Sequence, residues 1–266
     1  MTNEFKFKDK YNVYDLVDVI RALRSEGGCP WDIEQTHESI KKNLIEETYE
    51  TIEAINKGDA EMLREELGDV LMQVVFHAQI EDEKGVFNID DVADENCKKM
   101  IERHPHVFGE INVNSVDDVL TNWDAIKRKT KGQKTTSQAI DSVPRELPAL
   151  MRADKIQSKA AKAGFDWTQV DGALERLYEE IGELKEAIAN GNKDEISDEL
   201  GDVLFSAVNV SRFVKVDAEE ALTSSTDKFI GRFKKVEKLA EERGIDMKTS
   251  SLEILDELWD EAKKCM

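Results

Sequence analysis

Apolar residues recur every three or four positions along most of the chain, which is the spacing of one face of an α-helix. One such run comprises Val13, Leu16, Val17, Ile20 and Leu23, and a second extends from 63 to 78. No segment sustains the two-residue alternation of a half-buried strand. The four prolines leave two long proline-free stretches, 31–104 and 149–266, and proline interrupts helices. The pattern therefore predicts an all-α fold.

The helical periodicity lapses between residues 127 and 148, where the chain becomes rich in Lys, Thr, Ser and Gln. This composition is typical of an exposed linker. We therefore expect two helical domains, at 1–126 and 149–266, joined by a linker at 127–148. A length of 266 residues also suits two domains.

The two expected domains carry the same acidic motif. It reads E-E-x-x-E followed by E-L-G-D-V-L, at 46–50 and 66–71 in the first half and at 179–183 and 199–204 in the second. In both copies the third acid follows the second by 19 positions, so one offset of 133 residues superposes the copies. A Gly-x-x-Trp segment precedes each copy, starting at Gly28 and Gly164. Such self-similarity indicates a tandem duplication of one helical-bundle domain.

Each motif can form a cluster of four carboxylates. Acids three residues apart lie on one helix face, and the glycine between the two acidic pairs, Gly58 or Gly191, is a natural helix stop. Folding each segment into an antiparallel hairpin about that glycine would bring the pairs into two facing layers, roughly 4.5 Å apart along the helix axes. The predicted ligands are Glu47, Glu50, Glu66 and Asp69 in the first copy and Glu180, Glu183, Glu199 and Asp202 in the second.

Clustered carboxylates repel one another unless a cation neutralises them. Hard oxygen ligands select Mg²⁺, Mn²⁺ or Ca²⁺ over zinc, so we expect Mg²⁺, with Mn²⁺ as a substitute. Glu46 and Glu179, the first acids of the motifs, are rotated away from the others and are expected to lie outside the ligand set. A solvated acidic helix face is the alternative explanation, but the registered and duplicated arrangement argues against it.

A metal held by carboxylates, with water in its remaining positions, is suited to bind phosphates and to activate water. Phosphoryl transfer also needs cationic side chains, which Lys228 and Arg232 can supply, and Trp259 could stack on a base. The first copy repeats this arrangement at Lys99, Arg103 and Trp123. The alternative for each is an ordinary solvated or core side chain.

Composition limits the partners and the compartment. With 37 Lys+Arg against 57 Asp+Glu, the net charge of −20 argues against nucleic-acid binding. No apolar stretch is long enough to span a bilayer, and the amino terminus lacks the pattern of a secretion signal. We therefore expect a cytoplasmic protein with no membrane partner. Cys29, Cys97 and Cys265 lack metal-ligand spacing and should be ordinary thiols. His104 and His106 are expected to be structural.

Several longer motifs are highly specific. They are Gly28-Cys-Pro-Trp-Asp32, Gln35-Thr36, 44–50, 68–75, Arg103-His-Pro-His-Val-Phe108, Leu147-Pro-Ala-Leu-Met-Arg152, Gly164-Phe-Asp-Trp167 and 178–180. In these motifs the chain closely resembles the two-domain bacterial MazG nucleoside triphosphate pyrophosphohydrolases, in the all-α NTP pyrophosphatase superfamily. The resemblance covers nearly the whole length of the chain.

The resemblance implies Mg²⁺-dependent hydrolysis of NTPs or dNTPs to the monophosphate and pyrophosphate, by attack of water at the α-phosphorus. It assigns the metal to the two sets of four acids given above. It assigns the nucleotide contacts to Arg176, Lys228, Arg232 and Trp259. It also implies a homodimer in which helices of two subunits close each site.

The copies differ at one position on the acidic helix face. Four residues before the second acid, the second copy has Arg176 where the first has Asn43. A cation there could contact a triphosphate, whereas an asparagine contributes less. We therefore expect the carboxyl-terminal domain to be the main catalyst and the other domain to be weaker, specialised or regulatory.

Two other functions fit parts of the pattern. A di-iron carboxylate oxidoreductase would need Glu-x-x-His pairs, and none occurs at the registered acidic positions. A non-catalytic dimer that binds Mg²⁺ and nucleotide for regulation is the second alternative. The intact acid set in both copies argues against it for at least one domain.

Overall fold

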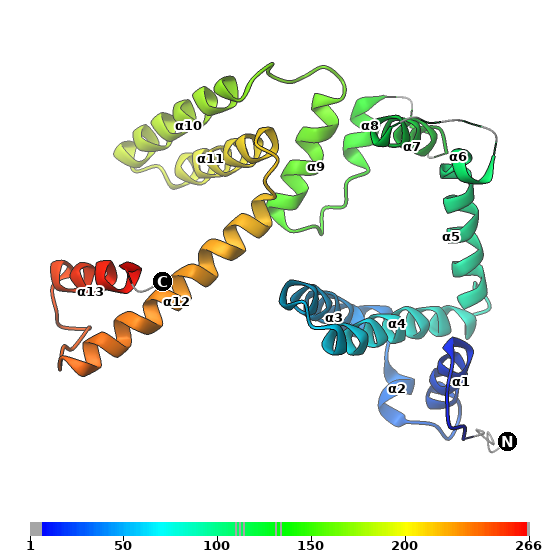
Figure 1. Cartoon of the computed structure of the whole chain (residues 1–266). Coiled ribbons are helices and arrows are strands. Elements are labelled where there is room, and N and C mark those ends of the chain that lie inside the picture. Colours follow the sequence, from blue (N-terminus) through cyan, green and yellow to red (C-terminus); the bar gives the residue numbers. More distant parts are fainter. Residues whose placement is uncertain are drawn as a thin grey trace. The chain divides into compact units, whose positions relative to one another are not determined.

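The computed structural model describes residues 7–264 except 110, 112, 114, 131 and 134, and describes only the backbone at 117, 120, 121, 124, 125, 128 and 129. All regular elements in this described part are helices, which confirms the all-α prediction (Figure 1). The chain divides into two compact units, Met1–Lys127 and Arg128–Met266. None of the described helices is both long and apolar enough to cross a bilayer.

The first unit contains α1 (Val13–Arg24), α2 (Pro30–Glu34), α3 (His37–Lys57), α4 (Ala60–Asp82), α5 (Ile89–Arg103) and α6 (Pro105–Phe108). The second contains α8 (Thr136–Asp141), α9 (Ala149–Ala161), α10 (Val170–Asn190), α11 (Lys193–Phe213), α12 (Ala218–Glu242) and α13 (Leu252–Lys264). Between them, α7 (Val116–Thr130) crosses the boundary of the two units. The central feature of each unit is a pair of packed helices, α3 with α4 and α10 with α11.

Local sequence signals set the turns of both hairpins. Gly58 ends α3 in the left-handed conformation, with φ 65°, and Gly191 ends α10 in the same way, with φ 72°. Glycine adopts this conformation without the steric cost of a Cβ. The next helix begins at once, because Asp59 and Asn192 cap α4 and α11 by accepting hydrogen bonds from backbone N–H groups of the first turn. Both hairpins therefore turn at the glycines that the sequence singles out.

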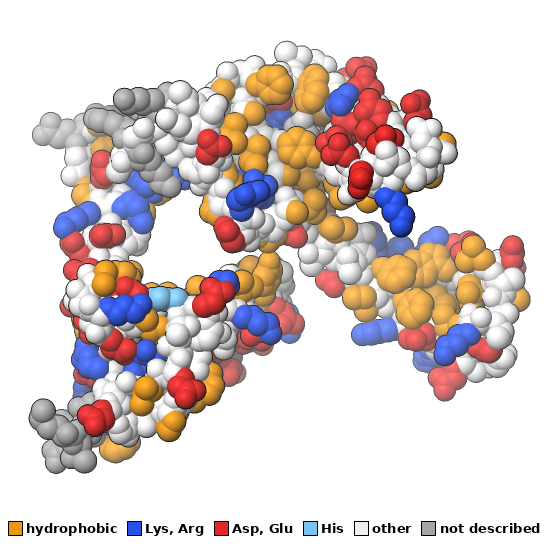
Figure 2. Space-filling view, turned by 180° about the vertical axis from the view of Figure 1, so that it is seen from behind, with side chains coloured by type: hydrophobic (Ala, Val, Ile, Leu, Met, Phe, Trp, Pro, Cys, Tyr) orange, Lys and Arg blue, Asp and Glu red, His pale blue; other side chains and the backbone are white. Residues whose placement is uncertain are grey.

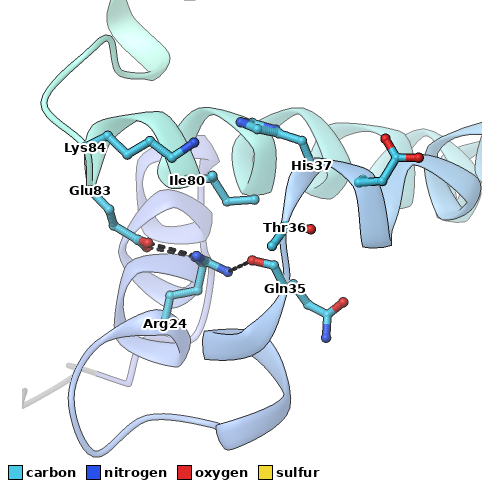
Figure 3. Close-up of a pocket in the computed structure, with 8 residues that line it drawn as sticks. Arg24, Gln35, Thr36, His37, Ile80, Glu83 and Lys84 are labelled. Carbon is cyan, nitrogen blue, oxygen red and sulfur yellow. Dashed lines mark hydrogen bonds and ion pairs between the residues drawn. The ribbon is translucent and has the colours of Figure 1, made fainter.

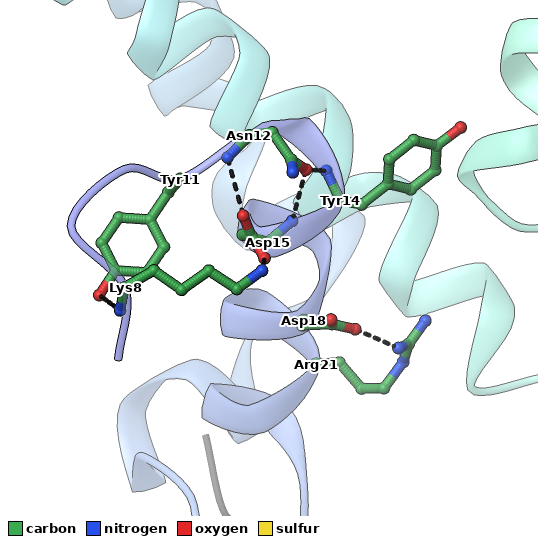
Figure 4. A network of polar contacts seen from close by, with 7 residues as sticks. All are labelled: Lys8, Tyr11, Asn12, Tyr14, Asp15, Asp18 and Arg21. Atoms are coloured by element: carbon green, nitrogen blue, oxygen red, sulfur yellow. Dashed lines mark hydrogen bonds and ion pairs between the residues drawn. The ribbon is translucent and has the colours of Figure 1, made fainter. Parts of the chain in front are cut away.

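The core of the first unit lies where α1 packs against the α3–α4 hairpin. Its buried members are Val17, Ile20, Ile40, Val75, Phe76 and Ile80. The start of α1 is fixed by a capping box in which Asn12 and Asp15 bond each other's backbone N–H, and Lys8 forms an ion pair with Asp15 (Figure 4). Because its start is capped and its apolar face packs against the hairpin, α1 stabilises the position of α3 and α4.

Arg24 joins the end of α1 to the hairpin and to the segment after α2 (Figure 3). Its guanidinium donates to both carboxylate oxygens of Glu83, each at 2.8 Å, and to the backbone oxygens of Asp32 and Gln35. It also lies over the ring of Phe76. The second unit has a related clamp, in which Arg212 of α11 donates to both oxygens of Asp166 before α10. Both clamps fix the segments that lead into the hairpins.

A chain of hydrogen bonds joins His37 at the start of α3 to α4. His37 Nε2 donates to Glu81 Oε1 at 2.6 Å, since a carboxylate can only accept, and His37 Nδ1 then faces His77 Nδ1 at 2.7 Å. The rings are nearly parallel, with centroids 5.0 Å apart, so they meet edge to edge. Lys84 completes the chain by donating to the same Glu81 oxygen. His77 Nε2 is buried and has no hydrogen-bond partner among the described residues.

This histidine pair predicts a pH-dependent stability. Burial lowers the pKa of His77 below its usual 6.5, and the neighbouring His37 lowers it further. The folded state therefore binds this proton less readily than the unfolded chain, and the stability that depends on neutral His77 is present above the unfolded pKa and lost as pH falls through the folded pKa. As the pH falls below the ordinary histidine pKa of 6.5, we expect the unfolding temperature to drop more steeply in the native protein than in His77→Asn. Equal slopes for the two proteins would contradict this assignment.

Part of the segment expected to be a linker is helical. Thr135 forms a capping box with Gln138 at the start of α8, and Ala139 and Val143 are buried where this stretch packs in the second unit against α9. The apolar side chains thus tie residues 136–143 to the second unit.

The second unit ends in a small lobe made by the distal half of α12 and by α13. Its buried core consists of Val236, Ala240, Leu258 and Ala262. The acidic helices α10 and α11 contribute nothing to this core, so the lobe and the hairpin are two packing centres within one unit.

Candidate metal and nucleotide site

The second hairpin brings three of the predicted acids together. Carboxylate oxygens of Glu180 on α10 and of Glu199 and Asp202 on α11 all lie within 4.8 Å of one another. Glu180 is buried, with 3% of its surface exposed, whereas Asp202 is exposed. In Figure 2, acidic side chains gather over this hairpin. The fold-back about Gly191 therefore produces a compact group of oxygen atoms.

Two of these oxygens have unsatisfied hydrogen-bonding capacity. Glu180 Oε2 and Glu199 Oε2 are buried and have no hydrogen-bond partner among the described residues. Buried carboxylate oxygens without a donor are costly. A divalent cation bound by this group would satisfy both, so the residues present fit an oxygen-liganded Mg²⁺ or Mn²⁺ site.

Burial and mutual repulsion disfavour the charged forms of these acids. Burial raises the pKa of Glu180, Glu183 and Asp202 raise it further, and Arg176 opposes the shift. Burial also raises the pKa of Glu199, with Glu183 and Asp202 adding to the effect. Raised carboxylate pKa values in a cluster indicate that the site is preorganised for positive charge.

The first hairpin repeats the arrangement in a more open form. Oxygens of Glu47, Glu66 and Asp69 lie within 4.8 Å of one another, and all three residues are half-buried. Burial raises the pKa of Glu47, and Asp69 and Glu50 add to the shift. Burial likewise raises the pKa of Glu66, followed by the effect of Glu50. The same chemistry is thus present in both units.

The remaining two predicted ligands lie at the edge of each cluster. Glu50 and Glu183 are exposed and are not within the closest group of three. They nevertheless lie near enough to raise the pKa values of Glu66 and Glu199, respectively. A flexible glutamate at this distance can turn toward a bound ion, so both residues stay predicted ligands. Glu46 and Glu179 are exposed, as expected for acids outside the ligand set.

Arg176 contacts the second cluster directly. Its Nε lies 2.6 Å from Glu180 Oε1, and its Nη1 donates to Glu179 Oε2 at 3.0 Å. The corresponding residue of the first unit, Asn43, is neutral and half-buried. Within the described residues, no ion pair joins a basic side chain to Glu47. The sequence places Arg176 on the acidic face, and the structure adds that it is bonded to a predicted ligand.

An arginine lies over a tryptophan in both units. The guanidinium of Arg232 is 5.9 Å from the ring centre of Trp259, and that of Arg103 is 5.4 Å from that of Trp123. Nε of each arginine is buried without a described hydrogen-bond partner. Phe229 also contacts Trp259, with ring centroids 5.1 Å apart. The duplication therefore preserves these pairs as well as the acids.

Apart from Arg176, the predicted nucleotide contacts lie on other helices than the acids. Lys228 and Arg232 are on α12 and Trp259 is on α13, while Lys99 and Arg103 are on α5. No described hydrogen bond or ion pair joins any of them to the acid clusters. Lys99 and Lys228 are exposed. Within one chain, the structure thus brings Arg176 to the second acid cluster but does not bring Lys99, Arg103, Lys228 or Arg232 into contact with either cluster.

The two histidines near the end of α5 have structural contacts. His104 Nδ1 bonds the backbone oxygen of Met100 at 2.6 Å, and its ring packs against Trp123 and His106. Among the described residues, the groups of His, Cys, Asp and Glu that could hold an ion contain carboxylates alone. These contacts agree with the expectation that His104 and His106 are not ligands.

Comparison with protein families identifies the class of this chain. A family model described as the MazG nucleotide pyrophosphohydrolase domain matches the chain twice, at residues 35–108 and 169–237. The chain belongs to the MazG family. It is therefore an enzyme, a nucleotide pyrophosphohydrolase acting on acid anhydride bonds. Both MazG matches include the predicted metal ligands, whereas Trp123 and Trp259 lie beyond them.

Similar proteins cover almost the whole chain. The nucleoside triphosphate pyrophosphohydrolase/pyrophosphatase MazG of Thermotoga maritima is 49% identical over 94% of this chain and 94% of its own length. The nucleoside triphosphate pyrophosphohydrolase of Escherichia coli K12 is 41% identical over 94% of this chain and 96% of its own. A Bacillus subtilis protein, YabN, is 48% identical over 92% of this chain, which corresponds to 50% of YabN. The similarity thus extends over nearly the whole length of the first two relatives.

Proposed function

We propose that this chain hydrolyses nucleoside triphosphates or their deoxy forms to the monophosphate and pyrophosphate, with Mg²⁺ or Mn²⁺, by attack of water on the α-phosphorus. The observation that carries the proposal is the second acid cluster, in which two buried glutamate oxygens have no hydrogen-bond partner in the described part of the chain. Relatives named as nucleoside triphosphate pyrophosphohydrolases support the substrate class. The di-iron alternative lacks any histidine in the described clusters.

Glu180, Glu199 and Asp202 would hold the metal in the second unit, with Glu183 turning in from the edge. When bound, the metal would supply Lewis-acid stabilisation of the phosphate oxygens and lower the pKa of a bound water. The α10–α11 hairpin contributes rigidity, since the ligands come from packed helices and not from loops. Arg176 contributes a guanidinium that can donate two hydrogen bonds to one phosphate group.

We assign the dominant activity to the carboxyl-terminal unit. Glu180 is buried there while Glu47 is only half-buried, and a carboxylate shielded from water interacts more strongly with a bound ion. Arg176 also supplies a phosphate-binding cation that Asn43 cannot. The amino-terminal unit is then the weaker or regulatory copy of the same site.

Closure of the site by a second subunit is part of the proposal. No described hydrogen bond or ion pair joins Lys228, Arg232 or Trp259 to the acids within one chain. Large apolar residues are also exposed at equivalent positions of the two hairpins, and exposed apolar surface of this extent is typical of an interface. They are Ile45 and Tyr178, Ile55 and Ile188, and Leu67 and Leu200. A homodimer would cover these residues and bring α12 and α13 of one copy toward the acids of the other.

The products and the attacked atom test this function. The purified chain is incubated with an NTP and Mg²⁺ in water enriched in ¹⁸O, and the products are followed by ³¹P NMR. We expect nucleoside monophosphate and pyrophosphate, with the heavy oxygen in the monophosphate because water attacks the α-phosphorus. Label in the pyrophosphate would reject the mechanism. Orthophosphate with nucleoside diphosphate would reject the function, and bound but unhydrolysed nucleotide would favour the regulatory alternative.

A further inference from the structure

Arg176 is a half-exposed cation bonded to a buried acid. The side chain of Arg176 is 42% exposed, that of Glu180 only 4%, and Nε and Oε1 lie 2.6 Å apart. The carboxylate is held by the packing of α10 on α11. The arginine has a long stem that reaches solvent, so it is the partner that can move.

The two oxygens of Glu180 are in different situations. Oε1 is bonded to Arg176, whereas Oε2 is buried and has no described partner. A divalent cation among Glu180, Glu199 and Asp202 would meet a positive charge already bonded to one of its ligands. Like charges repel at this range. In its observed position, Arg176 therefore opposes metal binding.

A polyphosphate offers Arg176 a better partner than one carboxylate. The guanidinium is planar and carries five N–H donors, and it binds phosphate through paired hydrogen bonds. If Arg176 moves from Glu180 to a phosphate group, Glu180 Oε1 becomes free for the cation and the positive charge leaves the cluster. Binding of the cation and binding of the polyphosphate would then each favour the other.

We propose that Arg176 couples metal binding to triphosphate binding in the carboxyl-terminal cluster, by exchanging Glu180 for a phosphate group. This inference rests on the proposed function, because it assumes that both ligands bind at this cluster. Coupling between two ligands is reciprocal. Bound triphosphate therefore raises the affinity for the metal by the same factor as bound metal raises the affinity for the triphosphate. Metal alone would bind this cluster weakly.

The amino-terminal cluster serves as the internal comparison. Asn43 stands at the position of Arg176 and has no charge to repel a cation. In the part of the chain that the structure describes, no basic side chain forms an ion pair with Glu47, Glu66 or Asp69. This cluster should therefore bind a divalent cation without help from a polyphosphate.

The test is a titration with Mn²⁺ alone, followed by the electron paramagnetic resonance of the free ion. The full chain carries Glu47→Gln, which weakens the amino-terminal site and leaves the carboxyl-terminal one to be measured. Adding Arg176→Asn should tighten the binding of Mn²⁺ by about five-fold or more, a factor at the lower end of typical couplings between two ligands. Arg176→Lys is the matched control, because it keeps the positive charge and should leave Mn²⁺ binding weak.

The reverse exchange provides an independent check in the other unit. In a chain carrying Glu180→Gln, the change Asn43→Arg should weaken Mn²⁺ at the amino-terminal cluster by a similar factor of about five or more. The coupling is wrong if Arg176→Asn leaves the Mn²⁺ affinity unchanged or lowers it. It is equally wrong if Asn43→Arg has no effect, so misfolding of one variant does not remove the test.

Failure of the coupling and failure of the function give different results. If the native chain makes monophosphate and pyrophosphate while Arg176→Asn binds Mn²⁺ as the native chain does, the coupling fails and the function stands. If Arg176→Asn tightens Mn²⁺ binding but the native chain hydrolyses no NTP, the function fails and the effect of Arg176 on the metal stands. A second measurement uses α,β-methylene ATP, whose α,β bond resists hydrolysis. Saturating Mn²⁺ should raise the affinity of the protein for this analogue less when the chain carries Arg176→Asn than when it keeps Arg176.

Discussion

Replacing Glu180 by glutamine is expected to lower kcat/KM for an NTP roughly 100-fold or more, which is the scale of losing one strong electrostatic contact in an active site. Glutamine keeps the shape of the side chain but removes a negative charge from the cluster. It also leaves a buried amide where the described residues provide no partner for Oε2. Glu47→Gln should retain most of the activity, because the amino-terminal cluster is more open and lacks an arginine.

The matched control for this comparison is Glu186→Gln, on the same helix α10 but exposed and outside the cluster. It removes the same charge from the chain and should leave kcat/KM close to that of the native protein. Initial rates of pyrophosphate release, measured for the three variants at one Mg²⁺ concentration, decide the matter. If activity disappears in Glu47→Gln and survives in Glu180→Gln, the amino-terminal unit is the main catalyst.

The acid clusters follow from the sequence because their determinants are local. A helix-stopping glycine and acids placed symmetrically about it suffice to bring the pairs together, and the structure has both hairpins turning at Gly58 and Gly191. The spacing does not give the side-chain rotamers. Glu50 and Glu183 therefore lie outside the closest groups, although they are at the predicted helical positions.

The hydrogen-bonded group of His37, His77 and Glu81 can also be predicted from positions relative to the turn glycine. His37 lies 21 residues before Gly58, while His77 and Glu81 lie 19 and 23 residues after it. Folding at Gly58 thus brings these three residues into one group, as the structure shows. In the expected linker, Thr135 and Gln138 have the spacing of a capping box, and α8 starts there.

The contacts of the C-terminal lobe depend on packing that motif spacing does not encode. Arg232 and Trp259 are separated by a turn between α12 and α13, and their approach is set by the shared core of Val236 and Leu258. The repeat in sequence identifies the residue types but not which surfaces meet. Likewise, it does not reveal that Lys228 and Arg232 form no described hydrogen bond or ion pair with the acids of their own chain.

Truncating Leu258 to alanine is expected to lower the free energy of unfolding of the lobe by about 2–5 kcal/mol, the usual cost of removing a large buried aliphatic side chain. Leu258 is 1% exposed and is the largest of the four buried residues in the lobe core, so its truncation leaves a cavity there. Loss of the core also loosens the α12–α13 contact that holds Arg232 over Trp259. If this pair binds nucleotide, KM should rise as well.

Ile254→Ala is the matched control, since this residue is on the same helix α13 and is 41% exposed. Its truncation should cost well under about 1 kcal/mol, because little apolar area is removed from a packed environment. Urea unfolding followed by far-UV circular dichroism gives both stabilities, and steady-state rates give KM. A Leu258→Ala protein as stable as Ile254→Ala would show that the lobe core contributes little to folding. A destabilised protein with unchanged KM would instead separate the Arg232–Trp259 pair from nucleotide binding, because the lobe supports that pair and the acids are held by α10 and α11.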